Sequence, residues 1–373
     1  MKKIAVLILC LMAVSAKAHR EDPRPDRPSI QLALLLDTSN SMDGLIGQAK
    51  SQLWRVVNDL ASAKCRGYAP RIEVALYEYG NSRLSAGESY LRQVLPFTND
   101  LDRVSEQLFG LRTNGGEEYC GAVIKDAVRN LNWDNRAQVY KTIFIAGNEP
   151  FTQGNVDFRN AIQRAVDKGI LVNTIFCGNR REGIETAWQD GAQRGRGDFL
   201  TINQDDPVAV LHTPYDDEIE RLGRALNDTY VYYGSEGRQA WDRRGRADSE
   251  ALKMAPAGAS VERSLFKSKS QYAESVAEKD AVSQVASGAL APSAIKKEDL
   301  PENYRGKNAK ELETLLKAKN TEREKIQKQL NALGEKRSQH LAAHQTAGES
   351  TLDKALLNAV RTQAGLKGFT FPQ

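Results

Sequence analysis

Apolar runs and amphipathic segments alternate along the chain up to about residue 234. Residues 30–36 (IQLALLL) form an almost unbroken apolar run, which is typical of a strand buried on both faces of a sheet. Residues 45–60 then carry apolar side chains at intervals of three and four, which predicts an amphipathic helix. Further strands are predicted at 71–79, 91–95, 142–146, 170–177 and 198–202, and further helices at 101–111, 120–131, 156–168, 182–193 and 216–227. This alternation predicts an α/β fold, a doubly wound and mostly parallel sheet flanked by helices, over residues 29–235.

The composition changes after this point. Only six of the chain's 26 aromatic residues lie in residues 236–373. Residues 236–300 are rich in Ala and Ser, and they are predicted to form a linker or a weakly helical segment. Residues 301–373 are predicted to be a helical region. The sheet domain is therefore expected to be followed by a largely helical or partly disordered C-terminal extension.

One long charged helix is predicted within that extension, over residues 310–343. Its leucines and isoleucine suggest an apolar stripe, but Lys319 and Arg323 interrupt it. The stripe lacks three clean heptads, so a coiled coil and a solvated helix both remain open. This C-terminal helix is a candidate for binding a partner or for self-association.

The first residues resemble a secretory signal peptide. Two lysines precede a 13-residue apolar run, and Ala16-Lys17-Ala18 follows as a small-x-small cleavage site. The run is shorter than the roughly 20 residues that span a bilayer. We expect residues 1–18 to be the signal peptide, residues 19–28 (HREDPRPDRP) to be a linker, and the protein to be exported to the periplasm or the extracellular space. No other apolar stretch is long enough to cross a membrane.

Bulk charge gives no case for nucleic-acid binding. The formal net charge is +4, and the leader contains three lysines and no acid, so the mature chain carries about +1. Four cysteines in 373 residues are too few for a disulfide scaffold.

Oxygen-bearing side chains follow the first predicted strand. The strand ends in Asp37-Thr38-Ser39-Asn40-Ser41, which has the pattern Asp-x-Ser-x-Ser. Ligands of doubly wound sheets bind beyond the carboxyl ends of the strands, and Mg²⁺ prefers oxygen ligands. Helix capping is the alternative, since Ser, Thr, Asp and Asn are favoured at helix N-termini. From spacing alone the two explanations are equally good.

The segment LALLLDTSNSM resembles the metal-ion-dependent adhesion site of von Willebrand factor type A domains. That family places a threonine on a later loop before a helix, and RTNGGEEYCGAV supplies Thr113 there. The resemblance implies that Ser39, Ser41 and Thr113 offer hydroxyls to a Mg²⁺ or Mn²⁺ ion and that Asp37 binds it through water. It also implies that the partner is a protein presenting an Asp or Glu side chain.

One position departs from the family pattern. The family usually has Thr-Asp-Gly at the end of the next core strand, and here Gly147 stands where the aspartate is expected. Glu149 is two residues further on and is a candidate replacement, while Glu117 and Glu118 lie near Thr113. A solvated role for Glu149 is the alternative. We expect a weakened cation site.

The cysteines of the mature chain are Cys65, Cys120 and Cys177. Cys120 begins a helix and Cys177 ends a core strand, so both are expected at the carboxyl edge of the sheet. This placement predicts a Cys120–Cys177 disulfide with Cys65 unpaired. The alternative is that all three are small buried apolar residues.

These features together predict an exported, non-enzymatic protein-binding module that recognises an acidic group through a bound cation. Two alternatives stay open: a metal-free interaction or structural protein with a degenerate metal site, and a hydrolase on the same α/β sheet. A hydrolase needs a base within hydrogen-bond reach of a nucleophile, and the sequence shows none.

Overall fold

The computed structural model of the chain describes residues 27–202, 212–253, 258–344 and 351–371. The predicted signal peptide, residues 1–18, and all but the last two residues of the predicted linker 19–28 lie outside the described residues. Within these ranges, no helix is both long enough and apolar enough to cross a bilayer.

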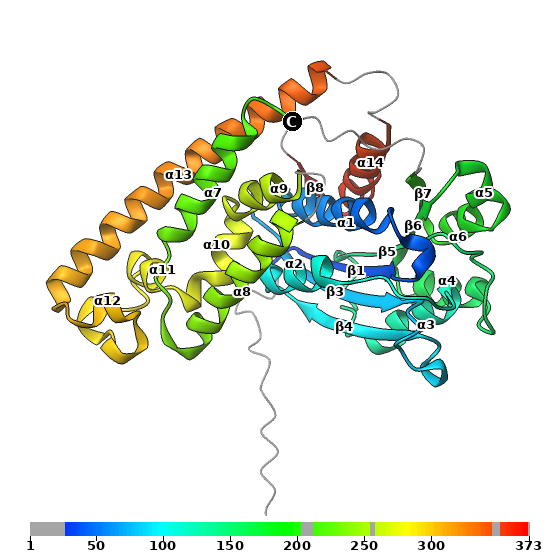
Figure 1. Cartoon of the computed structure of the whole chain (residues 1–373), viewed down its shortest axis with the longest axis horizontal. Helices are drawn as coiled ribbons and strands as arrows, with labels where there is room; N and C mark the ends of the chain where they lie inside the picture. Colours follow the sequence, from blue (N-terminus) through cyan, green and yellow to red (C-terminus); the bar gives the residue numbers. More distant parts are fainter. Residues whose placement is uncertain (1–26, 203–211, 254–257, 345–350, 372–373) are drawn as a thin grey trace, which may run out of the picture.

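A six-stranded sheet forms the centre of the molecule (Figure 1). Its strand order is β4-β3-β1-β5-β6-β7, and every neighbouring pair is parallel except β3 with β4. The strands are β1 (Ser29–Asp37), β3 (Arg71–Tyr79), β4 (Leu91–Thr98), β5 (Tyr140–Gly147), β6 (Leu171–Cys177) and β7 (Arg196–Ile202). The predicted α/β class with a doubly wound, mostly parallel sheet is therefore confirmed.

Helices cover both faces of this sheet. All nine residues of β1 are buried, as expected of a central strand covered on both sides. Its side chains alternate: Leu34 and Leu36 belong to one apolar cluster, Ala33 and Leu35 to the other. The first face is covered by α1 (Ile46–Leu60), α2 (Leu101–Gly110) and α14 (Thr351–Gly365), and the second by α3 (Cys120–Asn130), α4 (Phe158–Asp167) and α6 (Trp188–Arg194).

The predicted helix over 182–193 is two helices in the structure. These are α5 (Arg180–Glu185) and α6, and Ala187 stands between them with a φ of 70°. The left-handed backbone at this alanine ends one helix and redirects the chain into the next. The short helices η1 (Asn40–Met42), η2 (Ala86–Glu88), η3 (Ala277–Lys279), η4 (Pro292–Ala294) and η5 (Lys297–Asp299) complete the turns.

The linker predicted over residues 236–300 is wrong, and the structure shows the helical alternative. The region forms α8 (Gly234–Lys253), α9 (Gly258–Lys267), α10 (Ser270–Val276) and α11 (Ala281–Ala286). Phe266 is fully buried in the main core, and its ring lies 5.2 Å from the ring of Trp54 in α1. Tyr272 belongs to the same main core, whereas Ile295 and Leu300 belong to a smaller separate apolar cluster. Residues before and after position 235 therefore pack in the same hydrophobic core.

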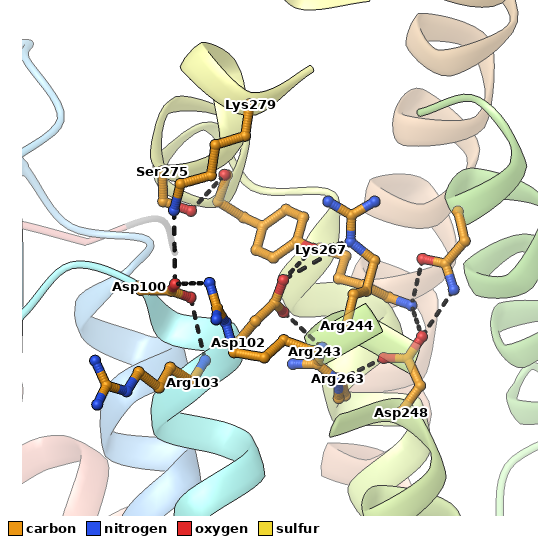
Figure 2. A network of polar contacts seen from close by, with 12 residues as sticks. Asp100, Asp102, Arg103, Arg243, Arg244, Asp248, Arg263, Lys267, Ser275 and Lys279 are labelled. Carbon is orange, nitrogen blue, oxygen red and sulfur yellow. Dashed lines mark hydrogen bonds and ion pairs between the residues drawn. The ribbon is translucent and has the colours of Figure 1, made fainter. Parts of the chain in front are cut away.

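A buried ionic network ties these helices to α2 (Figure 2). Asp102 of α2 accepts hydrogen bonds from Arg263 of α9 at 2.6 Å and from Tyr272 of α10 at 2.9 Å. Arg244 of α8 lies 3.7 Å from the same carboxylate. Burial alone raises the pKa of Asp102, but the charges of Arg263 and Arg244 reverse the effect, so the pKa lies below its usual value. Removing one partner of such a buried set leaves an uncompensated charge.

The long helix α13 (Ala309–His344) packs on its own chain. In Figure 1 it runs along α7 (Asp216–Asp228), with the short α12 (Glu302–Arg305) before it. Its apolar stripe is used in this packing, since Leu312, Leu316, Ile326 and Leu330 are buried. Arg323, which interrupts the stripe in the sequence, is also buried: it pairs with Asp280 at 2.9 Å and lies over the ring of Tyr230.

The last helix returns to the sheet domain. Leu356 and Val360 of α14 belong to the main core. The side chain of Gln363 hydrogen-bonds Asn173 of β6 and accepts from the hydroxyl of Tyr140 of β5. Beyond it, β8 (Phe369–Thr370) pairs with β2 (Lys64–Cys65), which follows α1. The end of the helical region therefore packs on the sheet domain, whereas Leu300 and Leu312 belong to a smaller apolar cluster within the helical region.

Candidate functional site

The candidate site lies where β1, β3 and β5 end side by side. Asp37 is the last residue of β1 and pairs in register with Tyr79, the last residue of β3. On the other side, Leu36 pairs with Ala146, one residue before Gly147 ends β5. Parallel strands thus bring the loops after Asp37, Tyr79 and Gly147 to one edge of the sheet, where ligands of such sheets bind.

The carboxyl of Asp37 is completely buried at this edge. Its Oδ1 accepts a hydrogen bond from the backbone N–H of Ser39 at 2.8 Å, but its Oδ2 has no hydrogen-bond partner among the described residues. A Cβ atom at Gly80 would lie 2.6 Å from Oδ1, so only glycine leaves room there. Burial raises the pKa of Asp37 to about 8, and the charges of Glu118 and Glu149 add to the effect.

The two predicted serine ligands are neighbours. Their hydroxyl oxygens are 2.8 Å apart, so Ser39 and Ser41 point into the same small space beside Asp37. Ser39 is buried and Ser41 exposed, which places the pair at the boundary between the core and solvent. The Ser41 hydroxyl also donates to the side-chain oxygen of Asn148 at 3.0 Å, and the Asn148 amide donates back to the Ser41 carbonyl at 3.1 Å. The loop after β5 thus holds the serine loop in place.

Thr113 reaches the same group of loops. The backbone N–H of its neighbour Asn114 donates to the carbonyl of Thr38 at 2.9 Å, which fixes the threonine loop against the loop after β1. The Thr113 hydroxyl itself donates to Asp43, just after η1. The structure therefore brings Thr113 to the serine loop with its hydroxyl engaged by a carboxylate that the sequence did not single out.

Glu149 and Glu118 add carboxylates to this edge. The negative charge of Glu149 acts on both Asp37 and Glu118, so Glu149 belongs to the site electrostatically. Glu118 is almost fully buried. Burial raises its pKa to about 7, Glu149 and Glu117 add to this, and a hydrogen bond with Ser39 opposes it. The sequence places Glu117 and Glu118 near Thr113 but does not show which of the two is buried.

A tyrosine accounts for the missing aspartate at Gly147. A Cβ atom there would lie 2.5 Å from the hydroxyl of Tyr79 and 3.0 Å from Cβ of Asp37. The Tyr79 hydroxyl donates to the carbonyl of Ala146 at 3.0 Å and lies 3.7 Å from the sulfur of Cys120. The phenol of Tyr79 thus fills the space that a side chain at Gly147 would need.

The prediction of a Cys120–Cys177 disulfide is wrong: the structure has no bond between these two cysteines. Both thiols are free and buried, as is that of Cys65. The two cysteines do lie toward the expected edge, but Cys120 packs in the apolar cluster on one face of the sheet and Cys177 in the cluster on the other. The sheet separates their side chains. Burial raises the pKa of both thiols far above the usual value.

The donors at this edge fit a hard divalent cation. They are hydroxyl and carboxyl oxygens, and the buried, unpartnered Oδ2 of Asp37 lacks the compensation that a nearby positive charge would supply. The strongest charges acting on Asp37 come from other carboxylates. Over the described ranges, no group of three or more His, Cys, Asp and Glu side chains is placed to bind a metal by itself. Any cation here would therefore depend on the serine and threonine hydroxyls.

Residues 31–186 match the model of the von Willebrand factor type A domain family. The match runs from β1 through α5 and includes the loops that carry Asp37, Thr113 and Glu149. It covers less than half of the chain. It is the same family that the Asp-x-Ser-x-Ser and threonine motifs resemble. No curated protein matches the chain significantly.

Solved structures resemble the chain at low sequence identity. The conserved hypothetical protein BatB from Bacteroides thetaiotaomicron has 17% identity and a TM-score of 0.37, over 47% of this chain and 91% of that one. Proximal thread matrix protein 1 from the mussel byssus, with a zinc-occupied adhesion-site motif, has 11% identity and a TM-score of 0.35, over 48% and 43%. The pilus adhesin SpaC from Lactobacillus rhamnosus GG has 13% identity and a TM-score of 0.37, over 48% and 28%.

Proposed function

We propose that this chain is an exported, protein-binding module that holds a divalent cation, Mg²⁺ or Mn²⁺, at the carboxyl edge of its sheet and recognises an acidic group of a partner protein there. One observation carries the proposal. The buried carboxyl of Asp37 has an unpartnered oxygen beside the paired hydroxyls of Ser39 and Ser41, within a segment that matches the von Willebrand factor type A family. Export rests on the leader-like residues 1–18, which lie outside the described residues.

Each residue has a distinct role in this proposal. Ser39, Ser41 and Thr113 would supply hydroxyl oxygens, and Asp37 would supply the negative charge that holds the ion. Glu149 and Glu118 would make the local field more negative, which offsets part of the charge lost at Gly147. When bound, the ion offers a carboxylate of the partner a charge-assisted contact. Thr113 would first have to release its hydrogen bond to Asp43, which lowers the affinity for the cation.

The proposed role is recognition and not catalysis. The histidine closest in sequence to the sheet domain's last strand, His212, is exposed and lies 3.7 Å from Asp217. No hydrogen bond joins it to Ser39 or Ser41 in the described part of the chain, so His212 does not serve either serine as the base of a nucleophilic mechanism.

A metal-free binding protein is the second candidate. It is favoured by the hydrogen bonds that already satisfy Ser39, Ser41 and Thr113, and by the raised pKa of Asp37, since a protonated carboxyl needs no counter-ion. In this alternative the site is a degenerate remnant and the binding surface lies elsewhere.

Capture from an exported-protein fraction tests the proposal. The full chain should retain a partner in Mg²⁺ and release it in EDTA. Asp37→Ala should abolish this cation-dependent part. Asp134→Ala is the matched control, because Asp134 lies at the opposite end of β1, where its backbone N–H donates to the side-chain oxygen of Gln31. If wild type and Asp37→Ala capture the same partner equally with and without chelator, the metal mechanism is wrong.

A further inference from the structure

A large open groove begins beside the candidate site. It has a volume of about 1160 Å³ and lies between α2, the segment after β3, and α8. Figure 1 shows α2 and α8 side by side. Its volume exceeds the roughly 300–1,000 Å³ of small-molecule pockets. The groove thus has room for a segment of polypeptide.

The groove adjoins the loops of the candidate site. Asn81 is among its lining residues, and the Asn81 amide donates to the Thr38 hydroxyl at 3.3 Å and to the Arg112 carbonyl at 3.2 Å. Thr38 lies between Asp37 and Ser39, and Arg112 precedes Thr113. The segments around Asn81 and Arg112 therefore adjoin both the groove and the loops of the candidate site.

The far wall is a face of α8. Trp241, Gly245, Ser249 and Lys253 line the groove at intervals of four residues, as one face of a helix does. Arg244 and Ala247 lie on the buried face of α8, and Arg244 joins the ionic network of Figure 2. The buried network therefore fixes which side of α8 faces the groove. Because residues beyond 235 supply this wall, the groove depends on the helical region as well as on the sheet domain.

The groove carries a small excess of positive charge, because five basic and four acidic side chains line it. The basic side chains are those of Arg83, Arg92, Arg112, Arg246 and Lys253. In the ion pairs they form with groove carboxylates, the cation is the exposed member: the Arg92 side chain is 54% exposed and its partner Glu78 5%, and Arg246 is 57% exposed and its partner Glu106 17%.

The other pairs follow the same rule. Arg112 and Lys253 share Glu250, which is less exposed than either of them. The exposed Arg83 guanidinium has no ion-pair partner among the described residues. Asp242 is an exposed carboxylate beside Arg246 and offsets part of this charge. A visiting chain therefore meets guanidinium and ammonium groups more than carboxylates.

We propose that this groove binds an extended acidic segment of the partner protein, next to the residue that occupies the candidate metal site. The proposal deepens the proposed function, but its cationic contacts need no metal. Rows of exposed cations attract acidic chains with a strong dependence on salt, because the contacts lie in solvent.

Fluorescence anisotropy of a labelled oligoglutamate peptide tests the groove in EDTA. The full chain should bind this peptide more tightly than a neutral Gly/Ser peptide of equal length, and added salt should weaken the binding. Arg83→Glu with Lys253→Glu should weaken it by about fivefold or more. Lys310→Glu with Lys317→Glu is the matched control, because it makes the same charge change at exposed positions of α13 and should have little effect.

Three results would overturn the groove proposal. One is equal binding of the acidic and neutral peptides. Another is an equal loss in the two double variants. The third is tighter binding of a single-stranded oligonucleotide than of the peptide, lost in Arg83→Glu with Lys253→Glu, which would assign the groove to nucleic acid.

Measuring peptide binding both in EDTA and in Mn²⁺ distinguishes failure of the groove proposal from failure of the proposed metal site. Peptide binding in EDTA that is lost on groove reversal but unchanged in Asp37→Asn supports the groove, even if Mn²⁺ adds nothing and the metal mechanism fails. Peptide binding that requires Mn²⁺ and Asp37 but ignores the groove reversal supports the metal site and overturns the groove.

Discussion

Replacing Asp37 with asparagine should change how the protein's stability depends on pH. Burial raises the pKa of Asp37 in the folded chain to about 8, whereas an aspartate in the unfolded chain titrates near about 4. Between these values the folded chain holds a proton that the unfolded chain has released. The stabilising contribution of the protonated carboxyl is complete below about pH 4 and is lost as the pH rises towards 8.

The expected size follows from the shift. Each pH unit between the two pKa values lowers the free energy of unfolding by about 1.4 kcal/mol, so Asp37 should account for about 2–3 kcal/mol between pH 5 and 7. The asparagine side chain does not titrate, so Asp37→Asn should lose this part of the pH dependence. All other titrating groups are common to both proteins, and the difference between them isolates Asp37.

Urea unfolding in EDTA at several pH values between 5 and 7 measures the effect. Asp134→Asn serves as the control, because hydrogen bonds and ion pairing with Arg136 overcome partial burial and lower the pKa of Asp134. Its contribution to stability is lost only in acid, below the range of the experiment. The contrary result is a free energy of unfolding that changes between pH 5 and 7 by the same amount in wild type and Asp37→Asn, within about 0.5 kcal/mol. That result would refute the claim that the Asp37 carboxyl is buried without a compensating charge.

Three further predictions follow from the packing. Phe266→Ala should lower the free energy of unfolding by about 3–5 kcal/mol in urea titrations, because its ring is buried against the sheet domain, and a loss below about 1 kcal/mol would contradict that placement. Gly147→Asp should destabilise the chain in thermal melts, because the new side chain meets the Tyr79 hydroxyl, and adding Tyr79→Phe should recover part of the loss; no recovery would count against this explanation. Alkylation with mass mapping should find Cys120 and Cys177 as thiols that react only after unfolding, and recovery of both in one disulfide-linked peptide would show that the bridge exists.

The sheet was predictable because its signals are local. The unbroken apolar run of β1 and the three-four spacing of α1 each lie within one segment, and the structure reproduces both nearly to the residue. The prediction of a linker over residues 236–300 was wrong for a physical reason. Its helices are buried partly through charged residues such as Arg263 and Lys267, which pair with Asp102 and Asp248, and a reading of hydropathy counts such residues as exposed.

Part of the candidate site was also predictable from local sequence, and part was not. Asp37, Ser39 and Ser41 lie within five consecutive residues, so the sequence alone identifies them. The burial of Glu118 and the engagement of Thr113 by Asp43 depend on how separate loops meet, and no spacing encodes this.

The disulfide prediction failed on a similar point. The edge of the sheet could be inferred for Cys120 and Cys177, but not the face on which each thiol lies. Strand alternation places Cys177 on the same face as Ile175, opposite the helix that carries Cys120.

Calorimetric titration of Mn²⁺ or Mg²⁺ into the full chain at neutral pH tests the central claim most directly. The account predicts saturable binding to one site in wild type, weaker binding in Ser39→Ala with Ser41→Ala, and none in Asp37→Asn, while Asp134→Asn binds like wild type. No saturable binding to wild type, or equal binding to Asp37→Asn, would contradict it.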